Sequence, residues 1–258
     1  MALTPRLPVD APQPRGLRYG LLTAAVGPVE LPTHGRASGI TYEPTTCGFT
    51  REYPVECTDP GLKTFDDGND LVDAEPFVAY ATYVCGAAGY TAAELEAKVR
   101  RRLMNGEQTS VERALADVIM TSPDTVSLLA PDSTSIAAVI GELEQWIYGD
   151  MQYGVTAYLH LPARASAYMA KEHTLIKDGP LWRTTMGTIV VFGGGYPDGI
   201  VHITGQTAVW RSEDIFVYPP DQVFDKINNQ FNLLAEREYA VAYDCLAASA
   251  PFDTGATS

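Results

Sequence analysis

The segment that decides the fold reads NQFNLLAEREYAVAYDCLA, residues 229–247. Its composition suggests a helix, but apolar and polar side chains alternate along it. Asn232, Glu236, Glu238 and Asp244 occupy even-numbered positions, and the odd positions are mostly apolar: Phe231, Leu233, Ala235, Tyr239, Val241, Tyr243 and Cys245. A period of two belongs to a strand, whose successive side chains point to opposite faces. We therefore predict a strand long enough to tie two domains together.

A long helix is predicted well before this strand. Thr91 followed by Glu94 forms a capping box, and the run AAELEAKVRRRLM continues with strong helix formers. Asn105 and Gly106 interrupt the pattern, SVERALADVIM resumes it, and Pro123 closes it. The expected result is a long helix with a break.

The middle of the chain mixes helices and strands. Asp132 or Ser133 can cap a helix with one apolar stripe, and Pro162 suits the first turn of a short helix over ARASAYMAK. The stripe consists of Ile136, Val139, Ile140, Leu143 and Ile147. Strands are predicted at VTAYLHL, TIVVF, IVHITG and TAVWRSEDIFVY. Because no unit repeats, the fold class is α+β rather than doubly wound.

The first part of the chain lacks these patterns. Residues 1–38 are rich in proline and have no helical period, so we expect an extended arm without a core of its own. Residues 39–75 mix β-prone pieces with the turn signals DPG and DDGND, which predicts a long hairpin-like excursion. The strand PFVAYATYVC follows it.

Charge and composition exclude several classes of protein. Thirty-two acidic residues against eighteen basic ones give a net charge of -14, which a phosphate backbone would repel. The basic run at 100–102 lies in a helix with Glu94 and Glu96 and is interpreted as a solvated or subunit-facing side. No apolar run approaches the roughly 20 residues of a membrane span, and no signal core is present, so we expect neither membrane insertion nor export.

Motifs of catalysis and metal binding are missing from the sequence. Cys47, Cys57, Cys85 and Cys245 show no CxxC spacing and are expected to be free thiols. The glycines in TIVVFGGGYPDG are followed by β-prone residues instead of a helix or a G-K-[ST] run, which favours a turn over a phosphate site. The histidines, His34, His160, His173 and His202, are scattered, and the two in β-prone text are interpreted as structural. We predict no catalytic, cofactor-binding or metal-binding residue.

Several of these pieces together resemble one family. They are Gly187-Thr-Ile-Val190-Val191, the strand TAVWR ending at Arg211, Asn229 with the later run AEREYAVAYDCLAASAPF, and YLHLPARASAYMAKE. GYTAAELEAKVRRRLMNGEQ falls where that family has its spine helix. The chain resembles the major capsid proteins of tailed bacteriophages and their encapsulin relatives over about residues 77–252. The resemblance rests on this pattern rather than on a diagnostic motif.

The resemblance implies a domain order. It assigns an N-terminal arm to 1–38, an extended β loop to 39–76, a peripheral domain with the spine helix to 77–130, an axial domain to 131–228 and a long C-terminal strand returning to the peripheral domain to 229–258. Residues expected to contact neighbouring subunits are Arg15, Tyr19, Phe49, Phe65, Arg100, Arg101 and Arg102. The expected axial loop comprises Gly193, Gly194, Gly195, Tyr196 and Pro197.

The resemblance also implies a function without catalysis. Copies of the chain would assemble as hexamers and pentamers into an icosahedral phage head, in the host bacterial cytoplasm, and enclose double-stranded DNA without reading its sequence. A separate scaffolding protein, a portal and decoration proteins are the further partners it implies. Two alternatives stay open: an encapsulin-type nanocompartment around a cargo enzyme, and an uncharacterised enzyme that binds a ligand at Gly193–Gly195.

Overall fold

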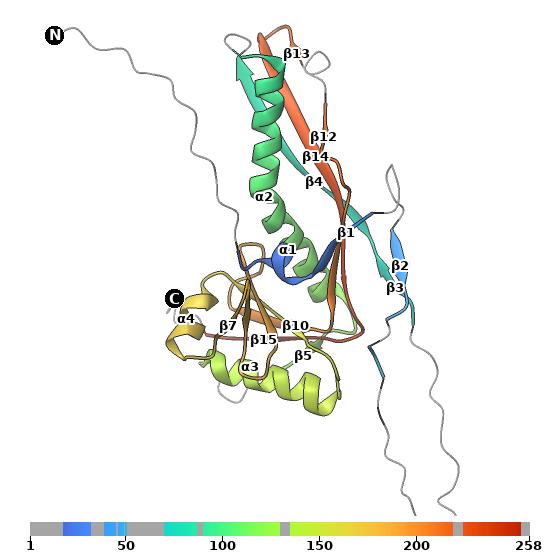
Figure 1. Ribbon diagram of the computed structural model, residues 1–258, viewed down its shortest axis with the longest axis vertical. Helices are drawn as coiled ribbons and strands as arrows, with labels where there is room; N and C mark the ends of the chain where they lie inside the picture. The colour runs from blue at the N-terminus through green and yellow to red at the C-terminus, as the bar shows by residue number, and fades with distance from the viewer. Residues whose placement is uncertain are drawn as a thin grey trace, which may run out of the picture.

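The computed structural model describes residues 18–31, 39–44, 46–48, 50, 70–86, 90–129, 135–218 and 224–253. They form two bodies, one tall and one compact (Figure 1). We call the tall one, a long helix on a six-stranded sheet, the peripheral body. The axial body is the compact one, a seven-stranded sheet with two further helices. One large cluster of buried apolar side chains lies within the axial body, and the other lies under the long helix and also includes residues of the axial sheet, among them Tyr158, Ile189 and Val191.

The long strand predicted at 229–247 is confirmed as β14, Gln230–Tyr243. It pairs antiparallel with the whole length of β4, Pro76–Gly86. On its opposite edge it pairs with β11 (Thr207–Arg211), β12 (Phe216–Val217) and β13 (Phe224–Asp225). Leu233, Ala235, Tyr239 and Val241 face the core beneath the long helix. The alternation in the sequence is therefore the alternation between the two faces of this sheet.

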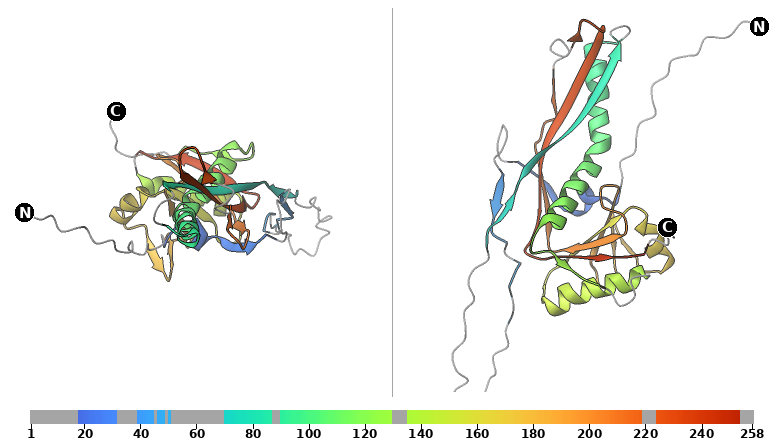
Figure 2. Two further views of the ribbon diagram at one scale, coloured as in Figure 1. Left: turned by 90° about the horizontal axis from the view of Figure 1, so that it is seen from above. Right: turned by 180° about the vertical axis from the view of Figure 1, so that it is seen from behind.

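The long helix α2, Ala92–Thr121, runs along one face of the β4–β14 pair in all three views (Figures 1 and 2). The capping box is present: the Glu94 amide donates to Thr91 Oγ1, and the Thr91 amide donates to Glu94 Oε2. The predicted break at residues 105–106 is wrong, because the helix continues through Asn105 and Gly106. The buried stripe continues on both sides of Gly106, and packing outweighs a glycine cost of about 1 kcal/mol.

The axial sheet has the order β5-β15-β10-β6-β9-β8-β7. Its central strands are β6 (Tyr158–Pro162), β9 (Ile189–Gly193) and β10 (Ile200–Thr204). Its outer strands are β5 (Val126–Ser127), β15 (Ala247–Pro251), β8 (Leu181–Arg183) and β7 (Ile176–Asp178). Helix α3, Ile136–Glu144, continues into the π-helical η1, Gln145–Asp150, and buries the whole predicted stripe.

Two local predictions in the axial body are corrected. Ser135 caps α3: its hydroxyl oxygen accepts from the Ala138 amide, and the hydroxyl donates to Glu172 Oε2 at 3.1 Å. The expected caps at 132 and 133 lie outside the described residues. Pro162 ends strand β6 opposite Gly193 and does not enter the short helix α4, Ala165–Lys171.

The sheets divide the chain differently from the expected domain boundaries. Strands β11, β12 and β13 fall within 131–228 but pair with β14 of the peripheral sheet. Strand β15 falls within 229–258 but pairs with β10 of the axial sheet. The chain therefore crosses between the two sheets more than once, from β10 to β11 and again from β14 to β15.

Part of the expected arm is folded into the body. Residues 18–31 include the one-turn helix α1, Leu21–Ala24, and strand β1, Val26–Glu30, which pairs parallel with β11. Leu21 is fully buried in the peripheral core, and the Phe192 amide donates to the Tyr19 carbonyl. The expectation of an extended arm over 1–38 is therefore wrong for this part, since its apolar side chains pack in the core of the same chain.

The excursion leaves the body through a two-stranded neck. Strands β2, Ile40–Tyr42, and β3, Val72–Ala74, pair antiparallel on the face of the peripheral sheet away from α2 (Figure 2). We call β2, β3 and the described residues up to Cys47 the root. A disulfide joins Cys47 to Cys245, with a Cα–Cα distance of 6.1 Å. The prediction of free thiols is thus wrong for this pair, which is 198 residues apart in sequence; Cys85 is free, and Cys57 lies outside the described residues.

Candidate assembly surfaces

The glycine turn after β9 lies against the long helix of the same chain. A Cβ atom on Gly195 would fall 2.6 Å from the Arg113 amide nitrogen and closer still to the Thr109 carbonyl oxygen. A Cβ atom on Gly193 would overlap the Glu112 carboxylate. The turn is glycine-rich because backbone and helix meet at a distance that excludes a side chain.

Glu112 occupies the concave side of this turn. Its carboxylate accepts from the Gly195 amide at 3.2 Å, the Leu21 amide at 3.4 Å and the Gln108 side-chain amide at 3.0 Å. The side chain is fully buried, and burial raises the pKa of its carboxyl although these hydrogen bonds oppose the shift. The N–H groups that a phosphate would need already bind a carboxylate, which would also repel a phosphate. The structure thus confirms a turn between strands, and the group that its N–H groups bind is the Glu112 carboxylate of the same chain.

The remaining members of the expected axial loop are divided between interior and surface. Tyr196 is buried, with its hydroxyl 3.1 Å from His160 Nδ1. Gly194 is exposed and Pro197 is half-buried. Only the exposed part of the turn is available to a neighbouring molecule.

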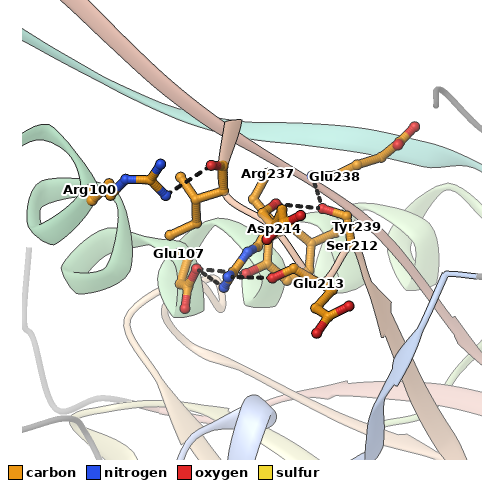
Figure 3. Close-up of polar contacts among 9 residues, drawn as sticks. Arg100, Glu107, Ser212, Glu213, Asp214, Arg237, Glu238 and Tyr239 are labelled. Carbon is orange, nitrogen blue, oxygen red and sulfur yellow. Dashed lines mark hydrogen bonds and ion pairs between the residues drawn. The ribbon is translucent and has the colours of Figure 1, made fainter. Parts of the chain in front are cut away.

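A second buried carboxylate joins the helix to the long strand (Figure 3). Glu107 of α2 accepts from the Tyr239 hydroxyl at 2.7 Å and forms an ion pair with Arg237 at 3.3 Å. Arg237 also donates to the Glu213 carbonyl at 3.0 Å, on the link between β11 and β12. These contacts fasten helix, strand and link at one point. The sequence contained the glutamate-arginine pair at 236–237, but nothing in it indicated that Arg237 pairs with Glu107.

Two of the three expected contact arginines have partners within the chain. Arg100 donates to the Ile215 carbonyl at 2.9 Å, and Arg102 donates to the Thr82 carbonyl at 3.0 Å. Arg101 is exposed. Arg100 and Arg102 therefore help to pack α2 on its own sheet, while Arg101 and Arg102 are both exposed.

An apolar stripe covers the outer face of β4. Val78, Tyr80 and Val84 are 43%, 69% and 57% exposed, on the face opposite the one that packs against α2. In the described part of the chain β4 pairs only with β14, so its other edge is also open. A long open edge with exposed apolar side chains is a ready surface for a second protein chain.

A cavity of about 550 Å³ adjoins Tyr19. Its aromatic lining consists of Tyr19, Trp182 and Phe192, and the ring centroids of the first two lie 5.5 Å apart. Arg18 and His173 also line it, at the point where the described chain begins. The structure thus places Tyr19 at the edge of an aromatic hollow. Arg15, Phe49 and Phe65 lie outside the described residues.

The buried histidines belong to the packing of the axial sheet, as predicted for residues in strands. His160 is bonded to Tyr196 and Thr204, and His202 Nδ1 lies 2.7 Å from Ser249 Oγ. Burial lowers the pKa of His160 to about 3 and that of His202 to about 4. Among the described residues, no group of three or more His, Cys, Asp or Glu could hold a metal ion. No described helix is long and apolar enough to cross a membrane.

Comparison with known proteins shows which fold this arrangement of elements has. The sequence matches no protein-family model and no curated protein. The structure, however, is similar to the capsid of an empty GTA particle, with a TM-score of 0.62, 12% identity and coverage of 98% of this chain and 96% of that one. The fold is that of the tailed-phage capsid subunits.

Two further solved structures share this capsid fold. A chain of Microbacterium phage Oxtober96 aligns with a TM-score of 0.59 and 11% identity, over 97% of this chain and 96% of that one. A virus-like particle from Pyrococcus furiosus aligns with a TM-score of 0.51 and 10% identity, over 90% and 92%. At these identities the likeness establishes the fold, and residue roles must be argued from the chain itself.

Proposed function

We propose that the protein is the structural subunit of an icosahedral phage head, which assembles from copies of itself and encloses double-stranded DNA. The observation that carries the proposal is the match of the capsid fold over nearly the whole of both chains. The arrangement of long helix, long hairpin and compact second sheet accounts for almost all of the described chain, and no separate catalytic domain is added to it.

Open surfaces of the subunit support self-assembly. The apolar stripe on β4 and its unpaired edge lie on the peripheral body, while the Tyr19 cavity adjoins the axial body. Closed shells need at least two separate contact surfaces on each subunit, because a single self-complementary surface would stop at a dimer. We propose that neighbours contact the subunit at both surfaces, and that Arg101 takes part.

Charge is consistent with a DNA container. A net charge of -14 gives a wall to which packaged DNA does not adhere. We propose that the shell holds its DNA by confinement, and that hexamers and pentamers of this chain, a separate scaffold, a portal and decoration proteins complete the particle in the host bacterial cytoplasm.

An encapsulin-type nanocompartment is the second candidate function. The likeness to the Pyrococcus furiosus virus-like particle favours it. The two functions differ in content: purified particles would contain DNA and a portal in one case and a cargo protein in the other. Nucleic-acid and protein analysis of particles from the native host separates them.

Deletion tests the proposed roles of arm and excursion. Removing residues 1–16 or 58–70 leaves every described element untouched, so the subunit is expected to fold. If these segments lie on neighbours, both deletions lower the yield or thermal stability of particles, measured by imaging and light scattering. Shells of normal yield and stability would contradict the roles.

A further inference from the structure

The root of the excursion is held to the body by few noncovalent contacts. In its small apolar cluster, Ala74 of the root and two alanines of β14 are buried. The larger side chains packed against them are only half-buried: Ile40, Tyr42, Val72 and Trp210. Tyr42 adds a hydrogen bond from its hydroxyl to the Tyr243 carbonyl, at 2.8 Å, and a ring contact with Trp210. Because its fully buried members are alanines and its larger side chains stay partly exposed, this cluster stabilises the position of the root less than the two main clusters stabilise their bodies.

The Cys47–Cys245 bond lies where three parts of the subunit meet. Cys245 is in the link between β14 of the peripheral sheet and β15 of the axial sheet, and Cys47 ends the root. The neighbouring Asp244 accepts hydrogen bonds from Thr46 of the root and, at 3.1 Å, from Tyr153 of the axial body. One covalent bond therefore ties the root to the junction between the two bodies.

We propose that Cys47 and Cys245 form a redox latch, with free thiols while subunits assemble and a disulfide in the finished particle. The inference rests on the proposed function, in which assembly takes place in a reducing cytoplasm. With thiols, the weakly packed root can adjust as the excursion reaches a neighbour. With the disulfide, the direction in which the excursion leaves the subunit is fixed.

The chemistry needs an external oxidant after assembly. Each thiol loses one proton and one electron as the S–S bond forms, and a disulfide such as oxidised glutathione accepts both electrons and both protons to give two thiols. Cys47 and Cys245 are both half-buried, so a small oxidant can reach them. In the disulfide form, hydrogen bonds from Tyr42 to the Tyr243 carbonyl and from Thr46 to Asp244 hold the root beside Cys245.

The test uses particles made from the full chain in a reducing cytoplasm. Cells are lysed in iodoacetamide, and peptide mapping by mass spectrometry reports whether Cys47 and Cys245 are alkylated or joined. A second sample, lysed without the alkylating agent, is treated with oxidised glutathione, and particle melting is followed by light scattering. We expect alkylated thiols in the first sample, and a bond with melting raised by several degrees in the second.

Matched variants assign the effect to this pair. Cys245→Ser and Cys47→Ser particles are expected to melt at the same temperature with or without oxidant, whereas Cys85→Ser, at the free and half-buried cysteine, keeps the wild-type shift. Reductant should reverse the shift in wild type and in Cys85→Ser, and it should leave the melting temperature of the other two variants unchanged. A bond already complete in freshly alkylated subunits, or oxidised particles that melt as reduced ones do, would overturn the latch while leaving the shell proposal intact. A chain that never forms particles would overturn both.

Discussion

The Gly195 amide donates to the buried Glu112 carboxylate at 3.2 Å, so the glycine turn of the axial body binds the long helix of the peripheral body. The Leu21 amide reaches the same carboxylate. The Glu112 side chain of α2 thus joins the long helix to α1 and to the glycine turn after β9. Burial of an acidic group is costly unless its oxygens are hydrogen-bonded, and here several donors supply those bonds.

Gly195→Ala is expected to destabilise the subunit by about 1–3 kcal/mol, because its methyl group would overlap backbone atoms of α2 that cannot move independently. Gly194→Ala is the matched control, since its nearest neighbour would be Thr109 Oγ1 at 3.7 Å, an ordinary contact. Its free energy of unfolding should stay within about 0.5 kcal/mol of wild type. Urea unfolding of both variants measures the difference, and equal effects would contradict the close approach.

The Glu107–Arg237 pair should be strongly coupled. Both side chains are nearly buried, so Arg237→Met leaves an uncompensated carboxylate and is expected to cost about 3–5 kcal/mol. Adding Glu107→Gln removes that charge, and the double variant should be more stable than the sum of the single changes predicts. A double-mutant cycle in urea measures the coupling. Additive effects would show that the two side chains do not interact.

Acid should weaken the subunit through its buried histidines. The pKa of His202 is lowered to about 4 from an ordinary 6.5, so the folded protein keeps the ring neutral while the unfolded chain protonates it. The stability that the neutral His202 ring contributes is fully present above pH 6.5 and is lost as the pH drops from 6.5 towards 4. His160, with its pKa lowered to about 3, acts in the same direction over a wider range.

His202→Gln should therefore lose less stability than wild type between pH 6.5 and 4, measured by thermal melting across that range. Glu112 has the opposite effect: because its pKa is raised, it adds stability as the pH falls towards 4.5. Only the difference in stability between variant and wild type therefore gives the contribution of His202. His173→Gln, at an exposed position, is the control and should follow the wild-type curve. Parallel curves for all three proteins would contradict the assignment.

Tyr80→Ser should separate folding from assembly. The side chain is 69% exposed on the outer face of β4, so the subunit is expected to melt within a few degrees of wild type. If the apolar stripe contacts a neighbour, the yield of particles falls severalfold, as judged by sedimentation and imaging. Asp117→Ser, at an exposed position on α2, serves as the control for loss of an exposed side chain. Normal assembly of Tyr80→Ser would show that the apolar stripe on β4 is not a contact surface.

Local periodicity predicted much of this fold. The alternation from Phe231 to Tyr243 predicted β14, and the Thr91 capping box predicted the start of α2, because both signals lie within a few residues of the element they describe. The continuous helix through Gly106 could not be predicted, since tertiary packing decides it.

The candidate surfaces depend on contacts between distant segments. Cys47 with Cys245, Glu112 with Gly195 and Glu107 with Arg237 are each separated by more than 80 residues, and no spacing rule connects them. One weak signal was present: Glu107 and Glu112 lie on the apolar face of α2, where a carboxylate needs a partner from another element.

Imaging of the purified full-length chain tests the central claim most directly. The protein is produced alone and together with a co-expressed phage scaffolding protein, fractionated by size, and examined by electron microscopy. We expect closed shells of uniform diameter, in the void fraction, under at least one of these conditions. A folded chain that remains a monomer under every condition would contradict its assignment as a shell subunit.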